Sequence, residues 1–210
     1  MKLNKFSKVI FVLSILKGIF VVSLILSLFL WSVPILSFNS DIWLIFQERS
    51  GVILDFENVR NYNELIVEFF KTGLNLEFLN EKELSHMKDV KTVITIANVL
   101  FIFSFISLIS GFSYFSKSQR KFLLKALRKT SLFVFVITLI FSVIILTNFH
   151  SSFMIFHKII FIRNFVFPAD SLLKILYPDE FFYGLSALYL LSVLIVSFIV
   201  AVISHRLKLK

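Results

Sequence analysis

Long apolar stretches alternate with polar ones along the chain, and their lengths predict its elements. Four runs are almost entirely apolar, at about 9–31, 92–114, 132–149 and 185–204. Each is close to the ~20 residues that a helix needs to cross the ~30 Å apolar core of a bilayer. The first run is longer than the apolar part of a secretory signal peptide and lacks an A-x-A cleavage site, so we interpret it as a retained helix. The pattern predicts an all-α integral membrane protein, a four-helix bundle in a single membrane domain over residues 1–210.

The polar segments between these runs also carry a pattern. The longer ones, about 32–91 and 149–184, mix large apolar residues with acids, as segments that lie on a membrane surface do. Within the first of them, the spacing of apolar residues predicts a short amphipathic helix that ends near Gly73. We expect the two segments to form a small outer-face cap of short interfacial helices.

A helix start is predicted just before the second apolar run. Asn80 and Glu83 have the spacing of a capping box, in which the Asn side chain accepts from a helix amide and the Glu side chain reaches back. A helix would then begin near Glu81 and continue into the apolar run. On it, His86 and Asp89 share a face, and His86 lies about 9 Å above Thr92, the first residue of the apolar run. The helix therefore places an imidazole, with a carboxylate able to orient it, at the depth of the lipid headgroups.

Composition supports the membrane assignment. The chain is 58% hydrophobic and 17% charged, and its mean hydropathy is +0.89. Soluble domains are about a quarter charged, so this chain needs a bilayer to cover its apolar surface. The sequence contains no cysteine. This absence excludes disulfides, thiolate metal sites and a thiol nucleophile.

The charges are distributed unequally along the chain. All 13 carboxylates lie in segments 32–91 and 149–184, whereas the amino end, the loop after the second run and the carboxyl end carry 12 of the 22 basic residues and no acid. By the positive-inside rule, both termini and the basic loop are expected to be cytoplasmic and the two long segments to face outward. The net charge of +9 then indicates contact with anionic lipid, and no nucleic acid is implied.

The second long segment holds further candidate site residues. His150 and His157 are seven residues apart and would share a face of a helix. Arg163, Asn164 and Asp170 are polar residues among aromatic ones, close to the membrane. Such a position is costly unless these groups pair with one another or with a ligand.

Motifs of several enzyme classes are missing. The nucleophile elbow of serine hydrolases fails at its second glycine in both "GFSYF" and "GLSAL". No H-E-x-x-H zinc motif and no glycine-rich phosphate loop occurs, so neither a zinc protease nor a nucleotide-driven enzyme is indicated. The remaining chemistry is acid–base catalysis by histidine, which takes and gives a proton near neutrality. An alternative is a metal site, with the candidate ligands His86, His150, His157 and Asp170.

Several stretches resemble a known family. "EKELSHMKDVKTV", "FHKIIF" and "RNFVFPADSLLKILYPDEFF", together with the four-span layout, resemble the lipoprotein intramolecular transacylase family of Gram-positive bacteria. The resemblance covers nearly the whole chain. It implies a cell-membrane acyltransferase that needs no cofactor and moves the sn-2 acyl chain of a diacylglyceryl lipoprotein onto the α-amino group of its N-terminal cysteine. The product is a lyso-form lipoprotein, and the positions that match the family's important histidines are His86 and His157.

The residues accommodate that reaction. An α-amine has a pKa near 8, so at neutral pH its attack requires a base. We expect His86, oriented by Asp89, to be the base and His157 to be the acid that protonates the departing glycerol oxygen. The two roles can also be exchanged.

Other residues are expected to bind the substrate. Arg163 or Asn164 would stabilise the tetrahedral oxyanion or hold the lipid, and Tyr177 and Asp170 would line the site. Capping of the following helix is an alternative role for Asp170. The expected partners are diacylglyceryl-modified lipoproteins and membrane lipid, and the expected active site faces the outside of the cell. Two alternative functions remain: a lipid-ester hydrolase that uses the same histidines, and a non-enzymatic membrane assembly or sensor protein whose acidic cap binds a partner.

Overall fold

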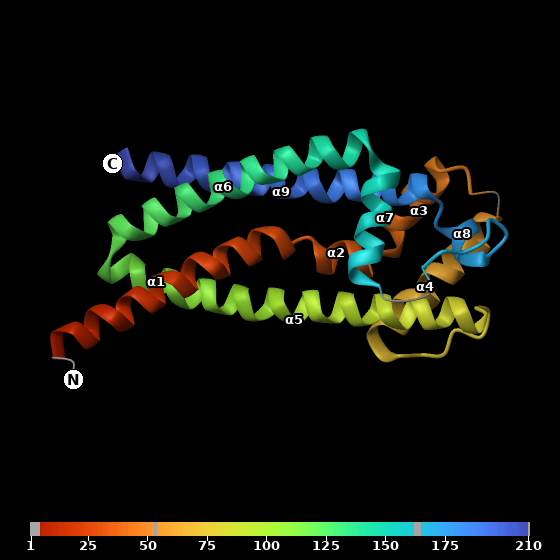
Figure 1. The fold of residues 1–210 in the computed structure, drawn as a ribbon, viewed down its shortest axis with the longest axis horizontal. Helices are drawn as coiled ribbons and strands as arrows, with labels where there is room; N and C mark the ends of the chain where they lie inside the picture. The colour runs from red at the N-terminus through yellow and green to blue at the C-terminus, as the bar shows by residue number, and fades with distance from the viewer. Residues whose placement is uncertain (1–4, 53, 162–164, 210) are drawn as a thin grey trace. The chain divides into compact units, whose positions relative to one another are not determined.

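Helices make up the regular structure of the chain. The computed structural model describes residues 5–52, 54–161 and 165–209, and within these ranges no strand is present. In chain order the helices are α1 (Lys5–Leu30), α2 (Val33–Phe38), α3 (Ser40–Arg49), α4 (Phe56–Thr72), α5 (Glu81–Ser118), α6 (Arg120–Thr147), α7 (Phe149–Ile160), α8 (Leu172–Leu176) and α9 (Asp179–Leu209) (Figure 1).

Four stretches of helix are long and apolar enough to cross a membrane. They are Ser7–Phe38, Glu81–Ser118, Arg120–Thr147 and Asp179–Lys208. Only 6% to 28% of the residues in their most apolar windows are buried inside the protein. Because these side chains are not covered by protein, their apolar surface requires lipid.

The chain forms two compact units. One comprises Met1–Trp31, Asn98–Thr138 and Ser192–Lys210, and the other comprises Ser32–Ala97 and Leu139–Leu191. The helices α5, α6 and α9 therefore each contribute one part to the first unit and another part to the second.

The first unit is built on close contact between α1 and α5. The Phe20 and Phe115 rings pack edge to face with 5.5 Å between their centroids. The Ser23 hydroxyl donates to the Ser107 hydroxyl over 2.9 Å. Gly111 allows this approach, because a Cβ at that position would lie 2.6 Å from the Phe20 ring. A small residue at a helix contact is a common feature of membrane helix pairs.

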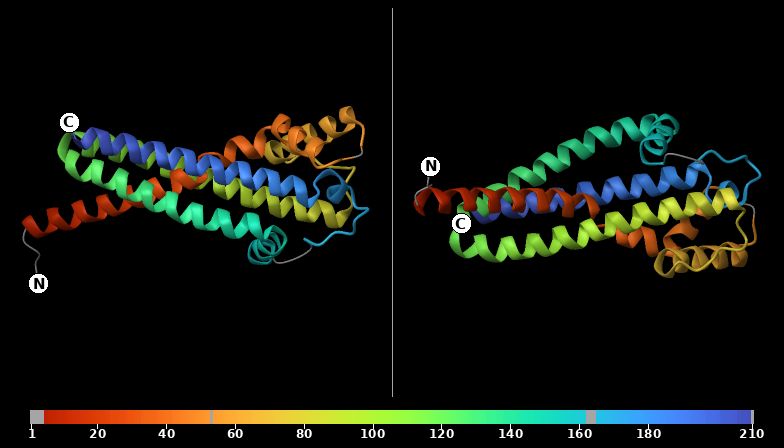
Figure 2. Two further views of the ribbon diagram at one scale, coloured as in Figure 1. Left: turned by 90° about the horizontal axis from the view of Figure 1, so that it is seen from above. Right: turned by 60° about the horizontal axis from the view of Figure 1, so that its bottom comes forward.

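The second unit holds the larger apolar core. In both Figure 1 and Figure 2, α3 and α4 lie side by side, and contacts between them are the most extensive of those between elements. Their apolar faces pack together with α5, α8 and α9. The buried members of this core are Trp43, Ile66, Val67, Phe69, Phe70, Leu76, Leu79, Met87, Leu173 and Phe181.

Two local predictions about the ends of helices are confirmed. Helix α4 ends at Gly73, which has a φ of 87° and whose amide donates to the Phe69 carbonyl. At the start of α5, the Glu83 amide donates to Asn80 Oδ1 over 3.0 Å and the Asn80 amide donates to Glu83 Oε2 over 3.1 Å. This reciprocal capping box starts the helix at Glu81, and the helix continues without a break into the second apolar run.

The chain changes direction between α6 and α7. Asn148 leaves the helical conformation, with φ −137° and ψ 57°, and α7 departs at an angle visible in both views of Figure 2. The predicted apolar run 132–149 thus extends two residues past the end of α6. This turn brings α7, with both of its histidines, to the cavity described next.

Candidate active site

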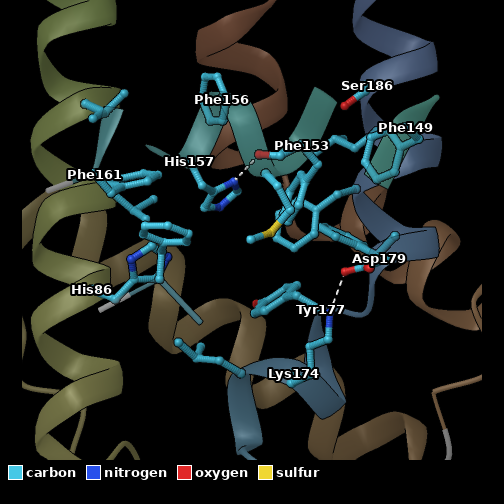
Figure 3. Close-up of a pocket in the computed structure, with 18 of the residues that line it drawn as sticks. His86, Phe149, Phe153, Phe156, His157, Phe161, Lys174, Tyr177, Asp179 and Ser186 are labelled. Carbon is cyan, nitrogen blue, oxygen red and sulfur yellow. Dashed lines mark hydrogen bonds and ion pairs between the residues drawn. The ribbon is translucent and has the colours of Figure 1, made fainter. Parts of the chain in front are cut away.

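A cavity of about 810 Å³ lies within the second unit (Figure 3). This volume falls within the ~300–1,000 Å³ typical of sites for small ligands. Aromatic and aliphatic side chains make up most of the wall. Among the described residues, the titratable groups other than tyrosines that line it are His86, His150, His157, Lys174 and Asp179. The cavity therefore suits an apolar ligand that carries a small polar part.

His86 lies on the first turns of α5, just after the capping box. Its side chain is 8% exposed and lines the cavity. The Nδ1 atom is buried and forms no hydrogen bond with any residue that the structure describes. Buried polar atoms are nearly always paired, and an unpaired one costs about 1–3 kcal/mol. His86 thus lines the cavity with a ring whose buried Nδ1 is not held by a hydrogen bond to any described residue.

His157 lies on the last turns of α7 and is also 8% exposed. Its Nδ1 lies 2.8 Å from the Phe153 carbonyl oxygen. A carbonyl only accepts, so Nδ1 carries the proton and donates it to this bond. In the neutral ring the lone pair then resides on Nε2, which makes Nε2 a proton acceptor. A backbone carbonyl therefore sets the tautomer of this imidazole.

The two imidazoles lie close together in an aromatic environment. Their ring centroids are 6.2 Å apart and their planes differ by 27°. Phe161 packs against both, with its centroid 4.8 Å from that of His86 and 5.3 Å from that of His157. Figure 3 shows the three rings on the same side of the cavity. Two imidazolium charges at this separation would repel each other, so at most one ring is readily charged at a time.

The environment of His157 favours its neutral form. Burial lowers its pKa below the ordinary value of 6.5; the bond to the Phe153 carbonyl and the charge of Asp179 act in the opposite direction, while the charge of Lys174 also lowers the pKa. The ring is therefore neutral at pH 7 and available to accept a proton at Nε2.

Tyr177 lines the cavity, and its hydroxyl belongs to a buried network of hydrogen bonds. Its hydroxyl donates to Asn63 Oδ1 over 2.7 Å, and the Asn63 amide donates to Gln47 Oε1 over 2.6 Å. Gln47 in turn donates to the Leu176 carbonyl over 2.9 Å. Burial raises the pKa of the Tyr177 phenol, so the hydroxyl stays protonated. This network holds α8 and the residue after it against α3 and α4.

A charged group forms another part of the wall. The Lys174 ammonium pairs with Asp179 Oδ1, and His150 Nδ1 lies 3.4 Å from Asp179 Oδ2. In Figure 3 the Lys174–Asp179 pair lies across the cavity from His86. Its side chains are about one-third exposed, at 38% for Lys174 and 33% for Asp179.

Comparisons with known proteins show the family and the fold of this chain. The model of the family described as lipoprotein intramolecular transacylase, Lit, matches residues 5–182. The chain belongs to this family. A solved structure of the membrane-integral transacylase Lit from Bacillus cereus matches with a TM-score of 0.82 at 16% sequence identity, over 93% of this chain and 95% of that chain. A comparison with curated proteins gives no match.

Two further solved structures are variants of the Bacillus cereus Lit protein, with one histidine replaced by arginine or by alanine. They match with TM-scores of 0.74 and 0.75, both at 16% identity. The first match covers 93% of this chain and 91% of that chain, and the second covers 98% and 97%. At this identity the likeness concerns the fold. Together with the four apolar helices, it confirms the predicted all-α, multi-pass membrane protein.

The Lit-family fold brings some of the predicted site residues together and leaves others apart. His86, His157 and Tyr177 line one cavity. Asp89 is exposed and does not line it. Asp170 is likewise exposed and away from the wall, and the residue that caps α8 is Ser171, whose hydroxyl accepts from the Lys174 amide over 3.3 Å.

The remaining predictions concern residues outside this set. Arg163 and Asn164 lie outside the described residues. Within the described part of the chain, no group of three or more His, Cys, Asp or Glu side chains is arranged to hold a metal ion. The described residues therefore provide no ligand cluster for the alternative of a metal site.

Sequence reasoning missed two groups of residues in this Lit-family site. It passed over the Lys174–Asp179 pair, although the Pro-Asp step before the last apolar run marked a helix start next to the histidine segment. It also missed Phe161, because the chain contains 28 phenylalanines and this one does not stand out among them. No local signal distinguishes a phenylalanine that contacts two catalytic candidates from one that faces lipid.

Proposed function

We propose that this protein transfers the sn-2 acyl chain of a diacylglyceryl lipoprotein to the α-amino group of that lipoprotein's own N-terminal cysteine. The product would be a lyso-form lipoprotein. Membership of the transacylase family supports the class of reaction. The observation that carries the proposal is the pair of buried imidazoles, 6.2 Å apart, in an apolar cavity. His86 and His157 are the proposed catalytic residues.

The cavity suits the substrate in two respects. Its apolar wall would accept an acyl chain, whose burial stabilises the complex by about 0.8 kcal/mol per methylene group. His86 lies where α5 is still polar, before its apolar run begins at Thr92, and His157 on α7 packs close to it. A diacylglyceryl group has its ester bonds between an apolar tail and a polar head. The ester would therefore meet the imidazoles while the tail occupies the cavity.

We assign the role of base to His157, because its tautomer leaves the Nε2 lone pair free. The neutral amine attacks the ester carbonyl carbon and forms the new C–N bond. His157 Nε2 takes one proton from the nitrogen, the bond between the carbonyl carbon and the glycerol oxygen breaks, and the proton goes to that oxygen. Atoms and charge balance, since an amine and an ester become an amide and an alcohol. This assignment exchanges the two roles first expected for the histidines.

His86 would assist from beside His157. Its ring lines the cavity, and its buried Nδ1 has no hydrogen-bond partner among the described residues, so the ring can turn toward a substrate oxygen or nitrogen without breaking another bond. We propose that His86 holds the leaving glycerol oxygen, receives the proton from His157 and passes that proton to the oxygen. Since amine and ester belong to one molecule, positioning of that molecule contributes much of the rate.

The proposed orientation places both termini in the cytoplasm and the cavity at the outer face. The distribution of charge between the compact units supports it. The unit without the cavity contains no Asp or Glu and more than half of the lysines and arginines, whereas all 13 carboxylates lie in the unit with the cavity. Basic segments stay on the cytoplasmic side.

Mass spectrometry of a reporter lipoprotein tests the function. Cells that express the wild type should yield an N-acylated cysteine with a monoacyl glyceryl group. His86→Gln and His157→Gln should each lower the rate by about 100-fold or more, as loss of an acid–base catalyst does. His205→Gln, a histidine of the other unit that pairs with Arg128, is the matched control and should retain activity. A wild type that leaves the diacyl form unchanged, or releases free fatty acid, refutes the transfer.

A further inference from the structure

The charged part of the cavity wall has no role in the mechanism above. Among the described residues that line the cavity, Asp179 is the one carboxylate and Lys174 the one lysine. Lys174 contacts Oδ1 of Asp179, and His150 lies 3.4 Å from Oδ2. The carboxylate is 33% exposed, so a cation that enters the cavity from outside can reach it.

A substrate of the proposed kind brings one positive charge to the cavity. Its α-amine has a pKa near 8 and arrives as an ammonium at neutral pH. A cation is unstable in an apolar cavity unless a counter-charge accompanies it. An imidazole carries no negative charge, so neither His86 nor His157 can provide one. Asp179 is the one described lining residue with a carboxylate.

On the basis of the proposed function, we infer that Asp179 binds the α-ammonium group of the lipoprotein's N-terminal cysteine. Each carboxylate oxygen can accept about two hydrogen bonds, so both retain capacity beside Lys174 and His150. Asp179 and His157 line the same cavity. An ammonium held by Asp179 therefore lies in the cavity that also contains the base.

Lys174 has a distinct part in this arrangement. In the free enzyme its ammonium occupies one oxygen of Asp179 and balances the charge of the carboxylate. An arriving α-ammonium would share that carboxylate with Lys174, and the two positive charges repel each other. The Lys174 side chain is 38% exposed, so it can move toward solvent when the substrate binds. Removal of the lysine should therefore strengthen, not weaken, recognition of the substrate's charge.

Binding of two non-reactive lipopeptides tests the inference. Both carry a dialkyl ether glyceryl group in place of the diacyl ester, so neither can undergo acyl transfer. One has the free α-amine of cysteine, and the other has des-amino-cysteine, which lacks it. The affinity of each would be measured at pH 6.5 for the full-length protein in lipid nanodiscs, by intrinsic fluorescence. Trp43 lines the cavity and would report the binding.

The wild type should prefer the amine probe by about fivefold to tenfold, as a partly exposed charge pair allows. Asp179→Asn should abolish this preference and leave the affinity for the des-amino probe unchanged, which also shows that the cavity is intact. Lys174→Met should keep the preference or increase it. If Asp179→Asn does not fold, the Lys174→Met variant still tests the inference. A Lys174→Met protein that no longer prefers the amine probe would overturn it.

Three other results would refute ammonium binding. They are the absence of a preference in the wild type, a preference that persists in Asp179→Asn, and an equal loss in both variants. The last indicates that the pair only joins α8 to α9. Because the ether probes cannot react, binding is measured independently of acyl transfer. A protein that fails to transfer acyl chains could still prefer the amine probe, and a protein that transfers them could lack this preference. Failure of the inference is thus distinguishable from failure of the proposed function.

Discussion

Glu83 links the start of α5 to the residues of the cavity wall, and its replacement is the most informative stability test. The carboxylate is 2% exposed. Its Oε2 accepts from the Asn80 amide and its Oε1 accepts from the Leu173 amide, each over 3.1 Å. The second bond joins α5 to the first turn of α8. The change we consider is Glu83→Gln, which preserves the size of the side chain.

The magnitude follows from the two bonds. Glutamine keeps one accepting oxygen and presents an NH₂ donor where the second oxygen was. One of the two backbone amides, that of Asn80 or of Leu173, then meets a donor and stays unpaired. A buried unpaired group costs about 1–3 kcal/mol, and loss of a capping contact costs a similar amount. We therefore expect Glu83→Gln to destabilise the protein by about 1–3 kcal/mol.

Thermal unfolding of the purified protein in detergent measures this effect, with Glu81→Gln as the control. Glu81 lies on the same turn and is exposed, so its replacement makes the same change of charge without a buried bond. Glu83→Gln should lower the unfolding midpoint by several degrees relative to Glu81→Gln. It should also lower transacylation per folded molecule, because α8 carries Lys174 and precedes Tyr177. Equal midpoints and activities of the two variants would refute the structural role of Glu83.

Further predictions concern the imidazoles and the helix ends. Because burial lowers the pKa of His157 below 6.5, this imidazole stays largely neutral between pH 6.5 and 8, whereas the substrate amine titrates there. The logarithm of the rate should therefore rise with a slope of about one per pH unit in this range and steepen to about two only below pH 6.5. A pH–rate profile that steepens above pH 6.5 would contradict the lowered pKa. Phe161→Ala should destabilise the protein by about 3–5 kcal/mol. Water then reaches His86 and His157, so the pH at which the slope of the pH–rate profile changes should move up toward 6.5. If this pH does not change, the aromatic environment is not the cause of the lowered pKa of His157. Gly73→Ala should cost about 1–2 kcal/mol, because its φ of 87° disfavours a Cβ, with activity per folded molecule retained; circular dichroism during heating checks the loss, and an unaltered midpoint would argue against strain.

The sequence by itself determined the features that depend on neighbouring residues. Apolar runs of sufficient length predicted the four long helices, because hydrophobic length is a local property. The capping box at Asn80 and Glu83 and the left-handed end at Gly73 were also predicted correctly, since each depends on hydrogen bonds within a few residues. The family resemblance singled out His86 and His157, which stay proposed as catalytic residues.

Tertiary structure alone decided how these side chains meet. His86 and His157 are 71 positions apart, and only the turn at Asn148 and the packing of α7 bring their rings together. Asp89 was expected beside His86, but residues three apart on a helix differ by about 60° in direction. That angle suffices to leave one side chain in the cavity and the other exposed. Which side of a helix is covered depends on its partners in space, and a short window of sequence does not encode them.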